Sequence, residues 1–252
     1  MGDPARRRRG DGRRHVDAAF RSRRPRARPP RLLGPGRRAA RAAAWVGALT
    51  EQLGLFPLGT VLLPTERIPL HIFEQRYQEL IGECLDLDTH FGLVFADDDG
   101  MREIGTRAFV VDVLDRFDDG RLNIAVEGHE RFRIVAETSG RSFLTAEVEP
   151  VGDEEVVSER SVRERALERF RKLGRVVESD VDEPDADSGV LSFELAARVD
   201  FGPERKQELL ELRSEPVRLG IVSDLLERAA EAITLERALA EAAAQNGRGL
   251  QH

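Results

Sequence analysis

The sequence predicts an α+β fold in which a small antiparallel β domain is followed by a helical domain. Between residues 91 and 151, apolar side chains recur at every second position in short runs separated by turn residues, as in half-buried strands. From about residue 155 onwards they recur every three or four positions, as in amphipathic helices. The chain of 252 residues is long enough for one large domain or for a compact domain with an appendage.

The first 50 residues differ in composition from the rest of the chain. Residues 1–45 contain 15 arginines and three aspartates, a net charge of +12, so the other residues carry −19 of the total of −7. Such a segment buries too little apolar surface to offset its ordering entropy, and we expect residues 1–50 to be a disordered, arginine-rich extension. We favour a start codon assigned too far upstream. A basic arm for nucleic acid or anionic lipid and a twin-arginine export signal at Arg37 and Arg38 are the alternatives.

Order is expected from residue 51. The apolar segment from Leu53 to Pro64 contains Pro57 and Gly59, which predicts a strand, a bend and a second short strand. A helix is predicted from about residue 73 to 86, because its apolar residues fall on one face. These residues are Phe73, Tyr77, Leu80, Ile81, Cys84 and Leu85.

Five further strands are predicted, at residues 91–96, 106–117, 121–128, 130–137 and 143–151. Residues 97–100 and the Asp-Asp-Gly at 118–120 are typical of turns, and Asp-Gly between alternating segments predicts a hairpin. Side chains expected to face inward are Phe109, Val111, Val113, Leu122, Ile124, Val126, Phe132 and Ile134, alternating with outward Arg131 and Arg133. Short strands with this spacing predict a small closed or strongly curled sheet.

The helical part begins with an amphipathic helix through Ala166 and Phe170, followed by an exposed acidic loop at 178–188 and a short helix at 192–200. Pro203 is expected in the first turn of the next helix, and Ser214 is expected to cap a long final helix. The predicted apolar face of this final helix contains Val217, Ile221, Leu225, Ala229, Ile233 and Leu239. The sequence thus divides into a β subdomain at 51–152, a helical subdomain at 153–245 and a frayed tail at 246–252.

Catalytic motifs are not evident in the sequence. A phosphate loop ends in Gly-Lys-Ser/Thr, and neither lysine, Lys172 or Lys206, has that context. Both lie on charged helical segments, which argues against the desolvated lysine of a serine–lysine protease dyad. Cys84 is expected to be a small core residue rather than a nucleophile. The histidines are scattered and residues 97–100 lack the remaining ligands of a calcium loop, so we expect no metal and no cofactor.

The segment around residues 56 to 77 is the richest in distinctive residues. Glu74 and Arg76 place both charges beside bulky apolar groups at the start of a helix. They form either a buried structural ion pair, which we favour, or a polar anchor in a peptide groove.

This segment is where the chain resembles a family, the N-terminal substrate-binding domain of Lon proteases. The resembling residues include LFPLGTVLLP, IPLHIFEQRYQELIGECL and FGLVF, followed in the right order by later motifs up to about residue 240. The signature residues, which can be structural, are Phe56, Pro57, Leu58, Pro64, Pro69, Leu70, Phe73, Glu74, Arg76 and Tyr77. The resemblance implies a PUA-like antiparallel pseudo-barrel with one packed helix, then a helical bundle ending in a long helix. It further implies a bacterial, standalone member without ATPase or protease domains.

The expected function is therefore binding without catalysis. The partner would be an unfolded or exposed-apolar polypeptide, or a specific protein in proteolysis or quality control, in the cytoplasm and not at a membrane. The binding site would be a cleft between barrel and helices, with Phe73, Arg76 and Tyr77 as contacts. The alternatives are a PUA-like nucleic-acid binder, which the acidic body disfavours, and a cryptic hydrolase.

Overall fold

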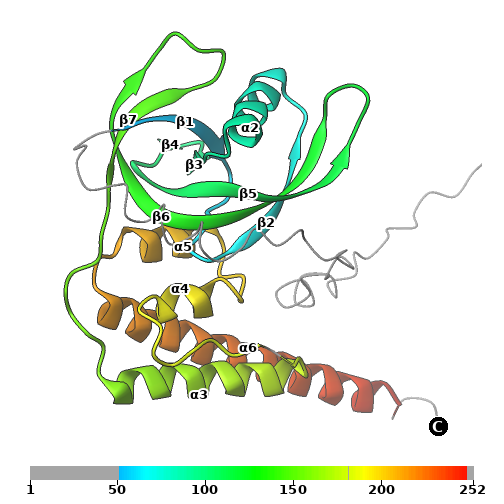
Figure 1. The fold of residues 1–252 in the computed structure, drawn as a ribbon. Coiled ribbons are helices and arrows are strands. Elements are labelled where there is room, and N and C mark those ends of the chain that lie inside the picture. The colour runs from blue at the N-terminus through cyan, green and yellow to red at the C-terminus, as the bar shows by residue number, and fades with distance from the viewer. Residues whose placement is uncertain (1–50, 181, 249–252) are drawn as a thin grey trace, which may run out of the picture.

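The computed structural model describes residues 51–180 and 182–248, with residues 244–248 by backbone alone. The predicted disorder of residues 1–50 and the last part of the predicted tail, 249–252, lie outside the described residues. Within the described residues, seven strands and five helices confirm the α+β prediction (Figure 1). Their bounds are β1 Glu51–Leu58, β2 Arg67–Ile72, α2 Gln75–Leu87, β3 Phe91–Asp97, β4 Gly100–Met101, β5 Ile104–Arg116, β6 Leu122–Thr138, β7 Thr145–Pro150, α3 Arg160–Val177, α4 Leu191–Ala196, α5 Pro203–Glu211 and α6 Glu215–Arg248.

Five strands close into a barrel in the cyclic order β1, β7, β6, β5 and β3. The contact between β1 and β3 is parallel, with Leu55 beside Gly92 and Leu58 beside Phe95, whereas the other four are antiparallel. This parallel pair closes the barrel, and the other pairings are antiparallel, as we predicted. β2 pairs with β6 and with no other described strand, so Pro69 lies on an edge strand, where proline is tolerated.

α2 lies across the opening of the barrel, between the β5–β6 hairpin and the β6–β7 connection (Figure 1). Its buried face, which includes Leu80 and Ile81, packs into the barrel core. Ser142, in the β6–β7 connection, donates a hydrogen bond to Glu79. On the other side, the turn at Gly120 has a φ of +86°, and a Cβ there would lie 2.8 Å from the Gln78 side-chain oxygen. Glycine thus satisfies both the turn and the close approach of hairpin and helix.

The predicted second strand within residues 53–64 is wrong. The second strand is β2 instead, and the segment before it is a loop whose Val61 and Leu63 are buried. The Leu63 N–H donates to the Glu66 carboxylate at 2.9 Å, and the Thr65 N–H donates to the Gly128 carbonyl at 2.8 Å. These two contacts, one within the loop and one to β6, satisfy the backbone without a strand ladder.

Three predictions for the long strands β5 and β6 are also wrong. Val111 is exposed, because a register shift between Val110 and Asp112 interrupts the alternation. The runs at 121–128 and 130–137 form one strand, β6, and Arg131 on it is buried instead of pointing outward.

The helical half consists of α3 to α6, stacked below the barrel in Figure 1. α3 and α6 run parallel, since Arg169 pairs with Asp224 and Glu178 pairs with Arg237. The predicted apolar face of α6 is rotated from the real one: the fully buried residues are Leu219, Val222, Leu226 and Ala230. Apolar residues occur in adjacent pairs on this helix, so periodicity alone does not select the member of each pair that faces the core. Among these elements, no helix combines the length and apolar character that a membrane crossing requires.

The barrel and the helical half share one apolar core. Four barrel residues, Val61, Leu63, Phe95 and Ile104, belong to the same cluster as the buried faces of α3 to α6. Because this cluster spans both halves, no open cleft separates them along this contact.

Charged side chains also cross this contact, and we call the set Arg131, Asp153, Ser192, Glu215 and Arg218 the junction. Arg218 is fully buried, and it donates to Asp153 at 2.8 Å, to Glu215 at 2.6 Å and to Ser192 at 3.0 Å. Arg131 reaches Asp153 from β6. Every charge in this set has an opposite charge beside it, which is what allows such a set to be buried.

Candidate binding surface

The three residues predicted to contact a peptide have different surroundings. Phe73 precedes α2 and its side chain is 62% exposed, so it is not part of the buried helix face. Arg76 is exposed and donates to Glu74 at 2.8 Å, so this ion pair lies on the surface and the buried structural pair that we favoured is wrong. Tyr77 is buried.

Tyr77 anchors the start of α2 to the barrel. Its ring meets Phe56 edge-on with centroids 4.1 Å apart, and the Arg76 guanidinium lies 4.5 Å from the Tyr77 centroid. Burial raises the pKa of the tyrosine hydroxyl. Tyr77 therefore supports the helix, and Arg76 covers it from the solvent side.

The family-signature residues are largely scaffold in this structure. Phe56, Pro64 and Tyr77 are buried and Pro57, Leu58, Leu70 and Glu74 are half-buried, whereas Pro69, Phe73 and Arg76 are exposed. Of the signature residues, these exposed ones are the most accessible to a ligand.

Phe73 belongs to an aromatic strip that periodicity did not reveal. The rings of Phe73 and His71 stack with centroids 5.9 Å apart, and Phe117 meets His71 edge-on at 6.2 Å. Phe117 comes from the end of the β5–β6 hairpin and is 40% exposed. We call Phe73, His71 and Phe117 the aromatic strip. The sequence does show an aromatic residue, Phe117, just before the Asp-Asp-Gly turn. Its proximity to Phe73, however, depends on how the hairpin packs.

A groove of about 230 Å³ adjoins this strip, between α2 and the β5–β6 hairpin, and we call it the hairpin groove. One face of α2 forms one wall, with Gln78 and Gly82 among its residues. The hairpin forms the other wall, and Phe117 belongs to both groove and strip. The lining residues are Gln78, Gly82, Leu85, Asp86, Arg116, Phe117, Gly120 and Leu122.

The outer face of the barrel continues from the aromatic strip. Residues paired across antiparallel strands point to the same face, so Asp115 of β5, Asn123 of β6 and His71 of β2 form one row. Asn123 joins the row: its amide donates to Asp115 at 2.9 Å and its oxygen lies 2.6 Å from His71. The next row along contains Asp112 of β5 and Pro69 of β2, both exposed.

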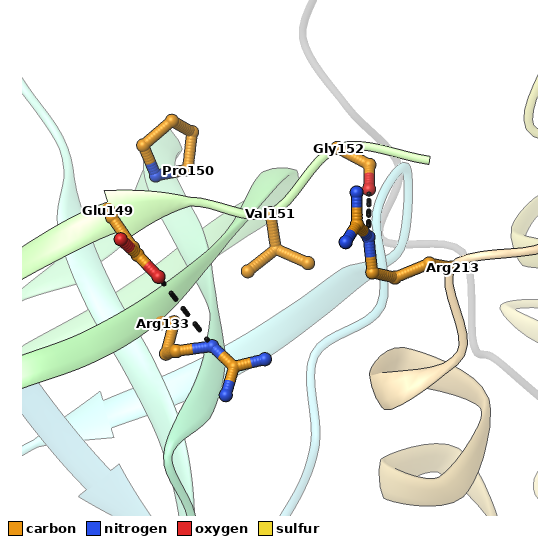
Figure 2. Close-up of a pocket in the computed structure, with 6 residues that line it drawn as sticks. All are labelled: Arg133, Glu149, Pro150, Val151, Gly152 and Arg213. Carbon is orange, nitrogen blue, oxygen red and sulfur yellow. Dashed lines mark hydrogen bonds and ion pairs between the residues drawn. The ribbon is translucent and has the colours of Figure 1, made fainter. Parts of the chain in front are cut away.

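A second, smaller pocket of about 110 Å³ lies where the barrel meets the α5–α6 connection. Figure 2 shows the guanidinium groups of Arg133 and Arg213 on either side of Val151. Arg133 lies 3.8 Å from Glu149, and Arg213 donates to the Gly152 carbonyl at 3.0 Å. This pocket lies between barrel and helices, where we expected a cleft, and its walls are mostly polar.

The residues weighed for catalysis are held in structural roles. Burial raises the pKa of Cys84 to about 12, which keeps the thiol protonated and unreactive near neutral pH. Lys206 is buried, contrary to our expectation of an exposed lysine, but its partner is Glu66 at 2.5 Å and not a serine. Lys172 pairs with Glu227 at 2.5 Å. In the described part of the chain, no three His, Cys, Asp or Glu side chains are grouped as metal ligands would be.

Comparison with known proteins shows the family. The model of the ATP-dependent protease La (LON) substrate-binding domain matches residues 52–228, and the chain belongs to this family. A Lon protease from Paraburkholderia phytofirmans is 29% identical over 81% of this chain and 28% of that protein. Lon protease 2 from Myxococcus xanthus is 30% identical over 74% of this chain and 25% of that protein. The chain thus spans about a quarter of the length of these relatives.

Solved structures agree with this assignment. The crystal structure of a Lon N-terminal domain protein from Xanthomonas campestris has a TM-score of 0.53 and 28% identity, covering 68% of this chain and 96% of that one. The N-terminal domain of Mycobacterium avium complex Lon protease has a TM-score of 0.56 at 18% identity, covering 70% of this chain and 98% of that one, and shows the fold alone. The family is a substrate-binding domain and not a catalytic one, as the sequence indicated.

Proposed function

We propose that this chain binds polypeptides that expose apolar segments, and that the hairpin groove and the aromatic strip form the binding surface. The observation that carries the proposal is the position of Phe73 and Phe117. Both are exposed, the ring of each contacts the His71 ring, and Phe117 lines the groove. Exposed aromatic rings beside a concave groove are typical of sites that anchor apolar side chains.

Polar groups on the same surface can orient a bound chain. Gln78 lines the groove and already donates its amide to the Phe73 carbonyl at 3.1 Å, which fixes the side chain at the groove edge. His71 and Asn123 place further donors and acceptors on the outer side of the strip. A few fixed polar groups around an apolar anchor are the usual arrangement in peptide-binding grooves.

The small volume of the groove favours a weak site that binds one side chain at a time. The groove of about 230 Å³ is smaller than the pockets of roughly 300–1,000 Å³ that enclose drug-sized ligands. We therefore expect it to hold a single bulky apolar side chain while the strip contacts its neighbour. An affinity on the order of tens of micromolar fits such a limited contact.

Peptide binding can be measured by fluorescence anisotropy. The probe is a labelled peptide of about ten residues with a central Phe-Leu pair in an otherwise polar, uncharged sequence. A Phe73→Ser/Phe117→Ser double variant should bind at least about tenfold more weakly than the unchanged chain, because aromatic anchors dominate such contacts. The matched control is Val156→Ser/Val157→Ser, which removes exposed apolar side chains elsewhere and should leave binding unchanged. Equal binding by both double variants would overturn the assigned surface.

The groove itself can be tested separately at Gly82. A Cβ built on Gly82 meets nothing within 4 Å, so a phenylalanine there can enter the groove without disturbing the helix. We expect Gly82→Phe to abolish peptide binding. Gly82→Ala should keep binding and stabilise α2 by about 1 kcal/mol, because alanine is the better helix former. If Gly82→Phe binds the peptide as well as Gly82→Ala does, the groove is not the anchor site.

We further propose that the bound polypeptides are substrates or partners in proteolysis or quality control. The support is that the relatives are Lon proteases and that the matched family is their substrate-binding domain. Anisotropy with a chemically unfolded protein and with its folded form tests this role. Binding of the unfolded form alone supports it, and equal binding of both contradicts it. Labelled RNA in the same assay tests the nucleic-acid alternative, for which tight, steeply salt-dependent binding is the signature.

A further inference from the structure

We infer that the proposed surface selects apolar segments that carry lysine or arginine next to the apolar anchor. This inference rests on the proposed function, and it names the class of polypeptide that the hairpin groove and aromatic strip would prefer. The expected preference depends on the charged side chains around the aromatic strip. What matters is where these charges lie and whether other side chains neutralise them.

Acidic side chains lie on both sides of the aromatic strip. Asp86 lines the groove on the α2 side. Asp115 lies on the outer-face side, linked through Asn123 to His71 of the strip, and Asp112 is in the next row. A peptide whose apolar side chain enters the groove would therefore pass carboxylates on both sides of its anchor.

These carboxylates are not neutralised by neighbouring cations. Among the described residues, Asp86, Asp112 and Asp115 make no ion pair, and neither does Asp118 in the hairpin turn. Surface carboxylates elsewhere commonly have a partner, as with Glu183 and Arg171 at 2.5 Å. A set of unpaired like charges destabilises its surroundings slightly, and a cationic ligand would relieve that repulsion.

One basic side chain opposes this charge within the groove. Arg116 lines the groove and is exposed, whereas the nearby Arg121 is held by Asp119 at 2.7 Å and lies 5.1 Å from the Phe117 centroid. Among the described residues of this surface, four unpaired aspartates against one unpaired arginine leave it negative. A segment rich in Asp or Glu would be repelled, and one with flanking Lys or Arg would be attracted.

The selectivity can be measured with three labelled peptides that share one Phe-Leu anchor. Two lysines, two glutamines or two glutamates flank the anchor, and anisotropy gives the affinity of each for the full chain. We expect the lysine peptide to bind about fivefold more tightly than the glutamine peptide, and the glutamate peptide more weakly still, as expected for exposed charges about 8 Å apart. At about 0.5 M salt the three affinities should converge, because the Debye length is then about 4 Å.

Matched variants identify the residues responsible. Asp112→Asn/Asp115→Asn keeps the side-chain shapes and removes two charges beside the strip, so it should lose most of the lysine preference but still bind the glutamine peptide. The control, Asp180→Asn/Glu231→Gln, removes two exposed charges from the helical half and should keep the preference.

The outcomes separate the two proposals. If none of the peptides binds, the proposed function fails. If all three bind equally at low salt, or if the control variant loses the lysine preference as fully as the Asp112/Asp115 variant does, the proposed function stands and the charge selection is wrong.

Discussion

Two of the arginine–phenylalanine contacts lie in regions that differ in burial and charge. At the junction, Arg218 lies 4.1 Å from the Phe193 centroid and is fully buried, with Asp153 and Glu215 beside it. At the hairpin, Arg121 lies 5.1 Å from the Phe117 centroid and is solvent-exposed.

The difference lies in how completely the surrounding charges are matched. At the junction each buried charge has an opposite partner, and Arg131 adds hydrogen bonds to the carbonyls of Leu210 and Leu212. Around the hairpin, Asp112 and Asp115 have no cationic partner in the part of the chain that the structure describes. Matched, buried charges hold the two halves together, whereas unmatched, exposed charges remain available to a ligand.

The largest expected effect comes from breaking the junction. Arg218→Met leaves the buried Glu215 without a cation and leaves Asp153 with Arg131 alone, and should lower the free energy of unfolding by about 3–5 kcal/mol. Urea unfolding followed by circular dichroism measures this loss. Arg121→Met is the matched change at the hairpin and should fall within the error of the measurement. Similar losses for both variants would erase the contrast between the regions.

A smaller, pH-dependent effect is expected at Lys206, another buried cation between the halves. Burial raises the pKa of Glu66 above 4.5, although the ion pair with Lys206 offsets part of this rise. A raised folded-state pKa gives stability that is present below 4.5 and lost as the pH rises. Without Lys206 the pKa of Glu66 rises further, so the penalty grows with pH.

Lys206→Met should therefore cost about 2 kcal/mol at pH 8 and clearly less at pH 5, measured by urea unfolding at both values. Lys172→Met, which removes the half-exposed lysine beside Glu227, is the control and should cost little at either pH. A penalty for Lys206→Met that is the same at both pH values would show that Glu66 stays ionised without its partner.

The smallest effect should appear at the hairpin and should have the opposite sign. Asp112→Asn/Asp115→Asn removes two unmatched like charges from the outer face, and should raise the free energy of unfolding by about 0.3 kcal/mol. Thermal unfolding at low salt is the suitable measurement, since screening hides the effect at high salt. A loss of more than about 1 kcal/mol would mean that these aspartates stabilise the hairpin. The proposed difference between the junction and the hairpin would then be wrong.

Much of the fold was predictable because local signals agreed with it. Pro203 begins α5, Asp119 and Gly120 turn the β5–β6 hairpin, and alternating Leu122, Ile124 and Val126 are all buried. The failures lie where a distant part of the chain decides the outcome. Arg131 and Lys206 look like solvent-facing charges until their partners, Asp153 and Glu66, are brought to them by the fold.

The candidate surface was only partly predictable for the same reason. Phe73 was singled out from the sequence, and the structure places it on the surface beside the groove. Phe117, His71 and Gly82 were not singled out as contacts, because their grouping requires the hairpin to fold against α2. Tyr77 shows the converse: its position on the helix face correctly predicted burial, and that same burial limits its role as a contact.

The shared core has a consequence for cooperativity. Leu63, Phe95 and Ile104 of the barrel are buried among the helices. Unfolding of either half would therefore expose part of the apolar core of the other half. We expect one thermal transition for the described part of the chain, seen alike by probes in either half. A partly unfolded state with the helices released would expose an apolar patch together with the charges of Arg131 and Glu66, and this makes such a state sparsely populated. The proposed binding surface, around α2 and the β5–β6 hairpin, lies on the side of the barrel away from the helical half (Figure 1), so it could accommodate a partner while the interior stays closed.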